Sequence, residues 1–475
     1  MIASHIGVGW RSSRSLRFVT FTTSLILAGI PAVQGGEPAE VAPGGAVEWR
    51  IEASHKVLPA PGQSFFARLA LRAPEVQREG REPLNLALVI DRSASMNSDS
   101  KIGYVRKAAH LLTDNLTRQD FVAIVTYNHE VQTLVPMHPV VNREYLHHRI
   151  VELTAAGETN ISGGLLEGCA QLEKRLTAAG QHRVILLTDG LANRGVTDPN
   201  QLVALAQKCA QRGIGVTTIG VGTDFNETLL TRMAQAGRGH YVYAANPDQI
   251  PAAIESELGA MLATVTQNVK LQMELPAGVE VQQVYGREEA FKPGVLEESL
   301  GDLTSGEERR MLIKFRVQQA PVPAISGPLE LRATLSYDNP ISATRSETEQ
   351  VVSLGRNGAG TAGQPSGGMD PILAYAQLVD DVDQIALVVK SMDRNLAAQV
   401  LQTRQTRFPV LKQIAAASKD QDFVNKAFMF EHYSRELAEL IENGALHDHS
   451  AARAALQKDL HYRRYMLDHH QGHSH

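Results

Sequence analysis

The stretch "LNLALVIDRSASM" (residues 84–96) joins an apolar run to a polar end. Residues 84–90 are almost continuously apolar, which is typical of a strand covered on both faces of a parallel sheet. The run then ends in Asp91, Ser93 and Ser95, three oxygen-bearing side chains on alternate residues. Open α/β sheets bind ligands at the carboxyl ends of their strands, so these residues lie where such a sheet would hold a ligand.

Strand and helix patterns alternate over residues 84–258. Further strands are expected at 120–128, 131–137, 182–190, 215–222 and 240–245. Helices are expected at 101–116, 143–154, 161–176, 199–213 and 226–237. This alternation predicts a doubly wound, mostly parallel α/β sheet.

The segments on either side of the α/β region have a different pattern. Residues 262–354 alternate apolar and polar side chains without helical segments between them, which predicts a β-sandwich. Residues 44–80 contain two similar strands, so we expect the α/β domain to be inserted into a sandwich built from both flanks. After the sandwich we expect a glycine-rich linker (355–369), a helical region (370–467) and a His-rich tail (468–475). Pro409 should kink or separate two helices of the helical region.

The N-terminus has the order of a secretory signal peptide. Three arginines precede an apolar stretch at 18–33, and small residues follow it. We therefore expect residues 1–36 to be a signal peptide and the mature chain to be periplasmic, extracellular or on the cell surface. An uncleaved N-terminal anchor stays open as the alternative.

Composition excludes several classes of protein. The chain has 475 residues and a formal net charge of -5, which does not favour nucleic acid as a partner. The two cysteines are too few for a disulfide framework or a thiolate zinc site. Cys169 and Cys209 could form one bridge in an exported protein or remain two separate buried thiols.

Two further residues extend the polar end of the first strand into a constellation. Thr159 lies in "AAGETNISGG" (155–164), a loop that enters a helix, and Asp189 ends the strand "VILLTD" (184–189). Asp-x-Ser-x-Ser, a distant Thr and a second Asp resemble the metal-ion-dependent adhesion site of the von Willebrand factor A domain. The resemblance covers about 160 residues and fits bacterial exported members; the inter-alpha-trypsin inhibitor heavy chains are more loosely similar.

The resemblance implies a metal ion held by Asp91, Ser93, Ser95, Thr159 and Asp189. Hydroxyl oxygens suit Mg²⁺, with Mn²⁺ and Ca²⁺ as alternatives, while the two aspartates act largely through bound water. Such an ion can accept an Asp or Glu carboxylate from a partner protein, so the expected function is metal-dependent protein binding or adhesion. In some members the last helix moves on binding, and the helix at 226–237 would be its counterpart here.

The same sequence leaves two alternatives to this function. The chain lacks H-E-x-x-H, G-x-S-x-G and Walker-type motifs, so we expect no enzyme, and a metal-dependent hydrolase is a distant alternative. A scaffold whose helical C-terminus makes the main contact is the other alternative. Glu158 precedes Thr159 and would either add charge to the site or point into solvent.

Overall fold

The computed structural model describes residues 46–76, 83–176, 180–287, 291–318, 328–340, 344–355, 370–418, 420–447 and 450–469. The signal peptide expected at 1–36, linker residues 356–369 and tail residues 470–475 lie outside the described residues. Among the described residues, no helix combines the length and apolar character needed to cross a membrane.

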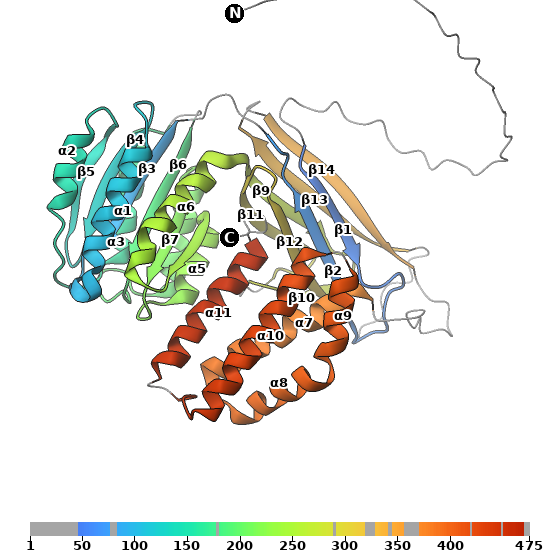
Figure 1. The fold of residues 1–475 in the computed structure, drawn as a ribbon. Coiled ribbons are helices and arrows are strands. Elements are labelled where there is room, and N and C mark those ends of the chain that lie inside the picture. The colour runs from blue at the N-terminus through green and yellow to red at the C-terminus, as the bar shows by residue number, and fades with distance from the viewer. Residues whose placement is uncertain are drawn as a thin grey trace, which may run out of the picture. The chain divides into compact units, whose positions relative to one another are not determined.

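A six-stranded sheet in the order β5-β4-β3-β6-β7-β8 forms the α/β region (Figure 1). Only β5 is antiparallel to its neighbour, so the mostly parallel sheet expected from the sequence is confirmed. All eight residues of the central strand β3 are buried. The strands are β3 (Leu84–Asp91), β4 (Phe121–Tyr127), β5 (Val131–Pro139), β6 (Gln181–Thr188), β7 (Gly215–Val221) and β8 (Arg238–Ala244).

Helices cover both faces of this sheet, as the doubly wound arrangement requires. One apolar core lies under α1 (Lys101–Asn115), α2 (Arg143–Val151) and α6 (Ile250–Ala263). The other core lies under α3 (Ile161–Glu173), α4 (Pro199–Gln211) and α5 (Glu227–Ala236). On this second face Cys169 of α3 and Cys209 of α4 form a disulfide.

The last helix of the α/β region is α6, not the segment at 226–237, so that expectation was wrong. Pro251 did not prevent this helix, because a proline in the first turn costs no intrahelical hydrogen bond. Glu257 fixes α6 to the sheet: its carboxylate lies 2.6 Å from Thr217 Oγ1 and 2.7 Å from His240 Nδ1. Burial raises the pKa of Glu257, but the charges of His240 and Arg183 outweigh it and lower the pKa to about 2.

Two four-stranded antiparallel sheets form the sandwich, in the orders β1-β2-β12-β10 and β11-β9-β13-β14. β2 pairs with β12, so the chain leaves the sandwich for the α/β region and returns to it, as expected. Apolar side chains fill the space between the sheets, including the stacked rings of Phe65 and Phe315. The strands are β1 (Glu48–Ala53), β2 (Ser64–Arg72), β9 (Thr264–Glu274), β10 (Val279–Val284), β11 (Val295–Thr304), β12 (Glu308–Val317), β13 (Leu329–Asn339) and β14 (Thr344–Leu354).

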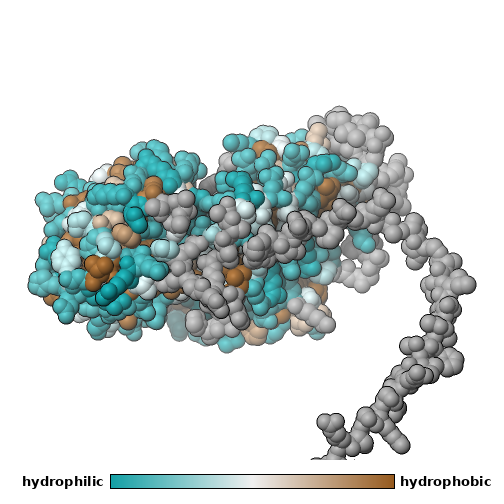
Figure 2. Space-filling model, turned by 90° about the horizontal axis from the view of Figure 1, so that it is seen from above, coloured by the Kyte–Doolittle hydropathy of each residue, from teal (hydrophilic) through white to brown (hydrophobic). Residues whose placement is uncertain are grey.

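The C-terminal region is helical, as the sequence predicts, and its apolar faces pack mainly against one another. Pro409 lies in the first turn of α9 and separates it from α8. On the face shown in Figure 2, hydrophobic residues are scattered among hydrophilic ones. The helices are α7 (Pro371–Ser391), α8 (Arg394–Thr406), α9 (Phe408–Ala417), α10 (Gln421–Glu442) and α11 (Ala451–His469).

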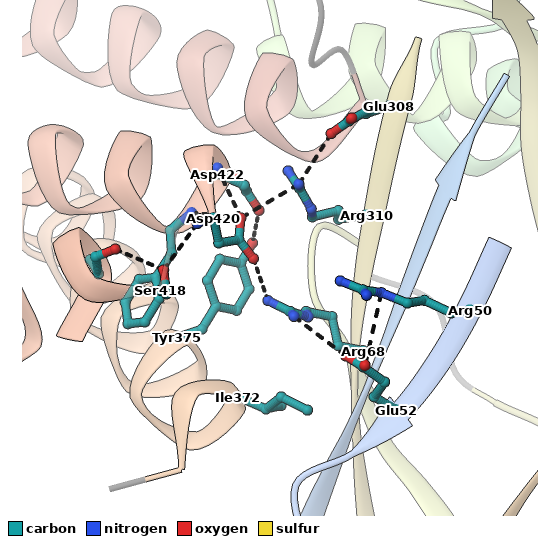
Figure 3. A network of polar contacts seen from close by, with 12 residues as sticks. Arg50, Glu52, Arg68, Glu308, Arg310, Ile372, Tyr375, Ser418, Asp420 and Asp422 are labelled. Carbon is teal, nitrogen blue, oxygen red and sulfur yellow. Dashed lines mark hydrogen bonds and ion pairs between the residues drawn. The ribbon is translucent and has the colours of Figure 1, made fainter. Parts of the chain in front are cut away.

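A partly buried ionic network joins the helical region to the sandwich (Figure 3). Asp420 caps α10 through the backbone N–H groups of Asp422 and Phe423. Its carboxylate also lies 2.5 Å from the Arg68 guanidinium and 3.5 Å from that of Arg310, on the neighbouring strands β2 and β12. One side chain therefore both starts a helix and fixes that helix to the sheet.

The disulfide gives the first prediction. Cys169 and Cys209 are separated by 40 residues, so the bridge restricts a long loop of the unfolded chain. Cys169→Ser with Cys209→Ser should lower the free energy of unfolding by about 4 kcal/mol. Denaturant unfolding of the oxidised proteins measures this loss. Equal stability of wild type and double variant would contradict it, and reductant should destabilise only the wild type.

The network gives a second prediction, with a matched control in the same region. Asp420→Ala should cost about 3 kcal/mol of unfolding free energy, because it removes a helix cap and leaves Arg68 and Arg310 without this carboxylate. Asp393 caps α8 in the same way but is exposed, so Asp393→Ala should cost only about 1 kcal/mol. Equal losses in denaturant unfolding would show that the contact with the sandwich contributes nothing.

Candidate metal centre

Asp91 is the last residue of β3, and its side chain is completely buried. One carboxylate oxygen accepts the backbone N–H of Ser93 at 2.8 Å, and the other accepts the Thr188 hydroxyl at 2.7 Å. Burial raises the pKa of Asp91 to about 6, although both hydrogen bonds act in the opposite direction. Asp91 thus fixes the turn that carries the two serines and ties it to the neighbouring strand β6.

The second aspartate directly follows β6 and is equally buried. Asp189 Oδ1 accepts the Ser95 hydroxyl at 2.7 Å, and Ser95 Oγ lies 3.0 Å from Ser93 Oγ. The other oxygen, Asp189 Oδ2, lies 2.6 Å from Nζ of Lys101. Ser95 is itself exposed, so this chain of polar contacts opens to solvent.

Thr159 reaches the site on a loop held by backbone hydrogen bonds. The loop is joined to the turn after β3 by Ala156 N–H to Arg92 O at 2.7 Å and Ala94 N–H to Gly157 O at 2.9 Å. Asn193 accepts the N–H of Thr159 at 2.7 Å. A Cβ atom on Gly190 would lie 3.6 Å from Thr159 Oγ1 and 3.8 Å from Ser95 Oγ, so the two hydroxyls border the same small space.

The structure therefore brings all five residues expected at the site together: Asp91, Ser93, Ser95, Thr159 and Asp189. The donors are three hydroxyls and two carboxylates, a set of hard oxygen atoms that fits Mg²⁺, Mn²⁺ or Ca²⁺. In the described part of the chain, His, Cys, Asp and Glu side chains form no cluster of three or more suited to a metal. Zinc sites in proteins are built from such clusters, and the described residues contain no site of this kind.

The rim of the site is partly exposed. Glu158 lies there and pairs with Arg194 at 2.8 Å, with both side chains more than half exposed. The charge of Glu158 is therefore balanced by Arg194 at the rim of the site. Leu191, next to Gly190, is 58% exposed, which is high for a large apolar side chain.

Three residues around the site were missed by the sequence reasoning. Thr188 binds Asp91, Asn193 binds the backbone of Thr159, and Lys101 pairs with Asp189. Thr188 and Asn193 lie within four residues of Asp189, so their place beside the motif was the available signal. Lys101 gave no signal of this kind, because it reads as an ordinary residue at the start of a helix.

Comparison with known proteins identifies the α/β region. The family model of the von Willebrand factor type A domain matches residues 85–256. YfbK of Escherichia coli is 32% identical over 238 residues, covering 49% of this chain and 41% of that relative, so the match leaves more than half of YfbK uncovered. The Synechocystis protein sll0103 is 28% identical over 359 residues, covering 72% of this chain and 83% of its own length.

More distant comparisons fit the same domain. Human inter-alpha-trypsin inhibitor heavy chain H3 is 28% identical over 169 residues, covering 33% of this chain and 18% of that protein. The solved structure of a von Willebrand factor type A protein from Catenulispora acidiphila has a TM-score of 0.59 at 16% identity. It covers 81% of this chain and 88% of its own length, so the shared fold extends beyond the α/β region. Residues 85–256 of this chain are therefore a von Willebrand factor type A domain.

Proposed function

We propose that this protein binds partner proteins through a divalent cation held by Asp91, Ser93, Ser95, Thr159 and Asp189. The observation that carries the proposal is the convergence of three hydroxyls and two buried carboxylates at the carboxyl end of β3 and β6. Mg²⁺ is the first choice, and Mn²⁺ and Ca²⁺ prefer the same oxygen donors.

The residues divide the work of such a site. Ser93, Ser95 and Thr159 offer neutral hydroxyls as ligands. Asp91 orients the turn of Ser93 through its backbone N–H, and Asp189 orients Ser95 through its hydroxyl. When bound, the cation would supply an electrophilic centre that can accept a carboxylate oxygen from outside.

The expected partner is a protein that presents an Asp or Glu side chain. Ser95 is exposed, so the site can be reached from solvent, and the exposed Leu191 offers an apolar contact at its rim. We also propose that the protein is exported to the periplasm, the cell surface or the medium. The arginine and apolar segments of residues 1–36 support this, as does the disulfide, since such bridges persist in oxidising compartments.

The scaffold alternative places the main contact on the helical region. Most large apolar residues of α7, α9 and α10 are buried in the core of that region, which favours internal packing over an open groove. We therefore keep the metal site as the primary binding element and propose no enzymatic activity.

Metal binding is tested on the purified protein. Mg²⁺ at about one hundred times its dissociation constant should stabilise the wild type by about 2.7 kcal/mol, and Thr159→Ala should lose most of this gain. Thr406→Ala, which changes an exposed threonine on α8, should retain it. Thermal unfolding with and without Mg²⁺ gives the comparison. Equal Mg²⁺ stabilisation of wild type and Thr159→Ala would refute the role of Thr159.

Partner binding is tested by capture from the native extracytoplasmic fraction. Proteins retained by immobilised wild type should be released by EDTA and should be absent from Thr159→Ala beads, as quantitative mass spectrometry can show. A partner that stays bound to both wild type in EDTA and Thr159→Ala would instead support the scaffold alternative, since it would not depend on the site.

A further inference from the structure

Lys101 is a buried cation beside the proposed metal site. Its side chain is 8% exposed, and Nζ lies 2.6 Å from Oδ2 of Asp189, which is fully buried. The other oxygen of Asp189 accepts the hydroxyl of Ser95. Lys101 therefore contacts the same carboxylate that orients one of the proposed ligands.

Two other features of this position destabilise the charged lysine side chain. Lys101 is the first residue of α1, and the positive end of a helix dipole repels a cation there. Burial of an ammonium group carries a further cost unless it is paired. Asp189 supplies that partner. The ion pair with Asp189 therefore stabilises the buried ammonium group of Lys101, whereas the dipole of α1 destabilises it.

The charge of the site follows from these contacts. Asp91 and Asp189 are two buried carboxylates, and Lys101 balances one of them. A divalent cation would make the group positive by one charge, whereas the same site without Lys101 would become neutral. A positive site binds the cation less tightly and attracts an external carboxylate more strongly.

We propose that Lys101 couples the binding of the cation to the binding of a carboxylate ligand at the site. The inference rests on the proposed function, because it concerns the same cation. Without a carboxylate ligand, the charge of Lys101 lowers the affinity of the site for the cation. A carboxylate ligand neutralises the excess positive charge and so restores this affinity. Thermodynamic linkage makes the effect reciprocal, so the bound cation tightens the binding of the carboxylate by the same factor.

A purely structural lysine would behave differently. If Lys101 only satisfied the buried Asp189, its replacement would lower stability and would leave the response of Mg²⁺ binding to a carboxylate unchanged. The two roles are thus separated by a binding measurement rather than by stability alone.

The experiment titrates wild type and Lys101→Met with MgCl₂ by calorimetry, in potassium chloride and in potassium acetate of equal ionic strength. In chloride, Lys101→Met should bind Mg²⁺ about tenfold more tightly than wild type, because a neighbouring positive charge is gone. Acetate should tighten Mg²⁺ binding in wild type and should have little effect in the variant. Lys101→Arg, which keeps the charge, should behave like wild type.

Lys107→Met is the matched control, since Lys107 lies exposed on the same helix, and it should leave both affinities unchanged. Lys101→Gln can still donate to Asp189 and replaces Lys101→Met if circular dichroism shows that the latter is unfolded. If Lys101→Met binds Mg²⁺ no more tightly than wild type, or if acetate tightens Mg²⁺ binding equally in wild type and Lys101→Met, the role of Lys101 is refuted while the proposed function stands. A wild type that binds no Mg²⁺ would overturn both the proposed function and the inference.

Discussion

The burial of β3 on both faces is the constraint on which the site depends. A strand with eight buried residues has no room for polar side chains along its length, except where they are fully satisfied. Polar residues therefore gather where the strand ends. Because β3 and β6 are parallel neighbours, Asp91 and Asp189 reach the same edge although they are far apart in sequence. The hydroxyl of Thr188, bonded to Asp91, joins the two strand ends.

The sequence predicted those parts of the structure that depend on short segments. The spacing of apolar residues predicted the parallel sheet, the sandwich and the helical region. The residues around Asp91 and Asp189 predicted which side chains make up the candidate site. Contacts between distant segments were not readable. The Lys101–Asp189 pair joins residues 88 positions apart, and the pairing of Cys169 with Cys209 was left open. The last helix was misplaced because α6 follows β8 across a short proline-containing turn.

The return of the C-terminal helix α11 to the A domain is another contact that local patterns could not reveal. Lys458 pairs with Glu227 of α5, and the Tyr465 hydroxyl accepts the backbone N–H of Tyr241 in β8. β8 is an edge strand, and unpaired edge groups invite pairing with other chains. By covering this strand, α11 protects the sheet edge and makes the helical region part of the same folded unit as the A domain.

The donor set of the site has a consequence for what it can bind. If the ligands were carboxylates, they would neutralise a divalent cation and leave little attraction for an external anion. Hydroxyls from Ser93, Ser95 and Thr159 add no charge, and the two aspartates are already engaged by Ser93, Thr188, Ser95 and Lys101. With Lys101 balancing one of the two aspartates, a divalent cation in the proposed site would leave one net positive charge for a ligand from solvent. Under the proposed function, the same arrangement would lower the affinity for the cation alone, so metal and partner would depend on each other for tight binding.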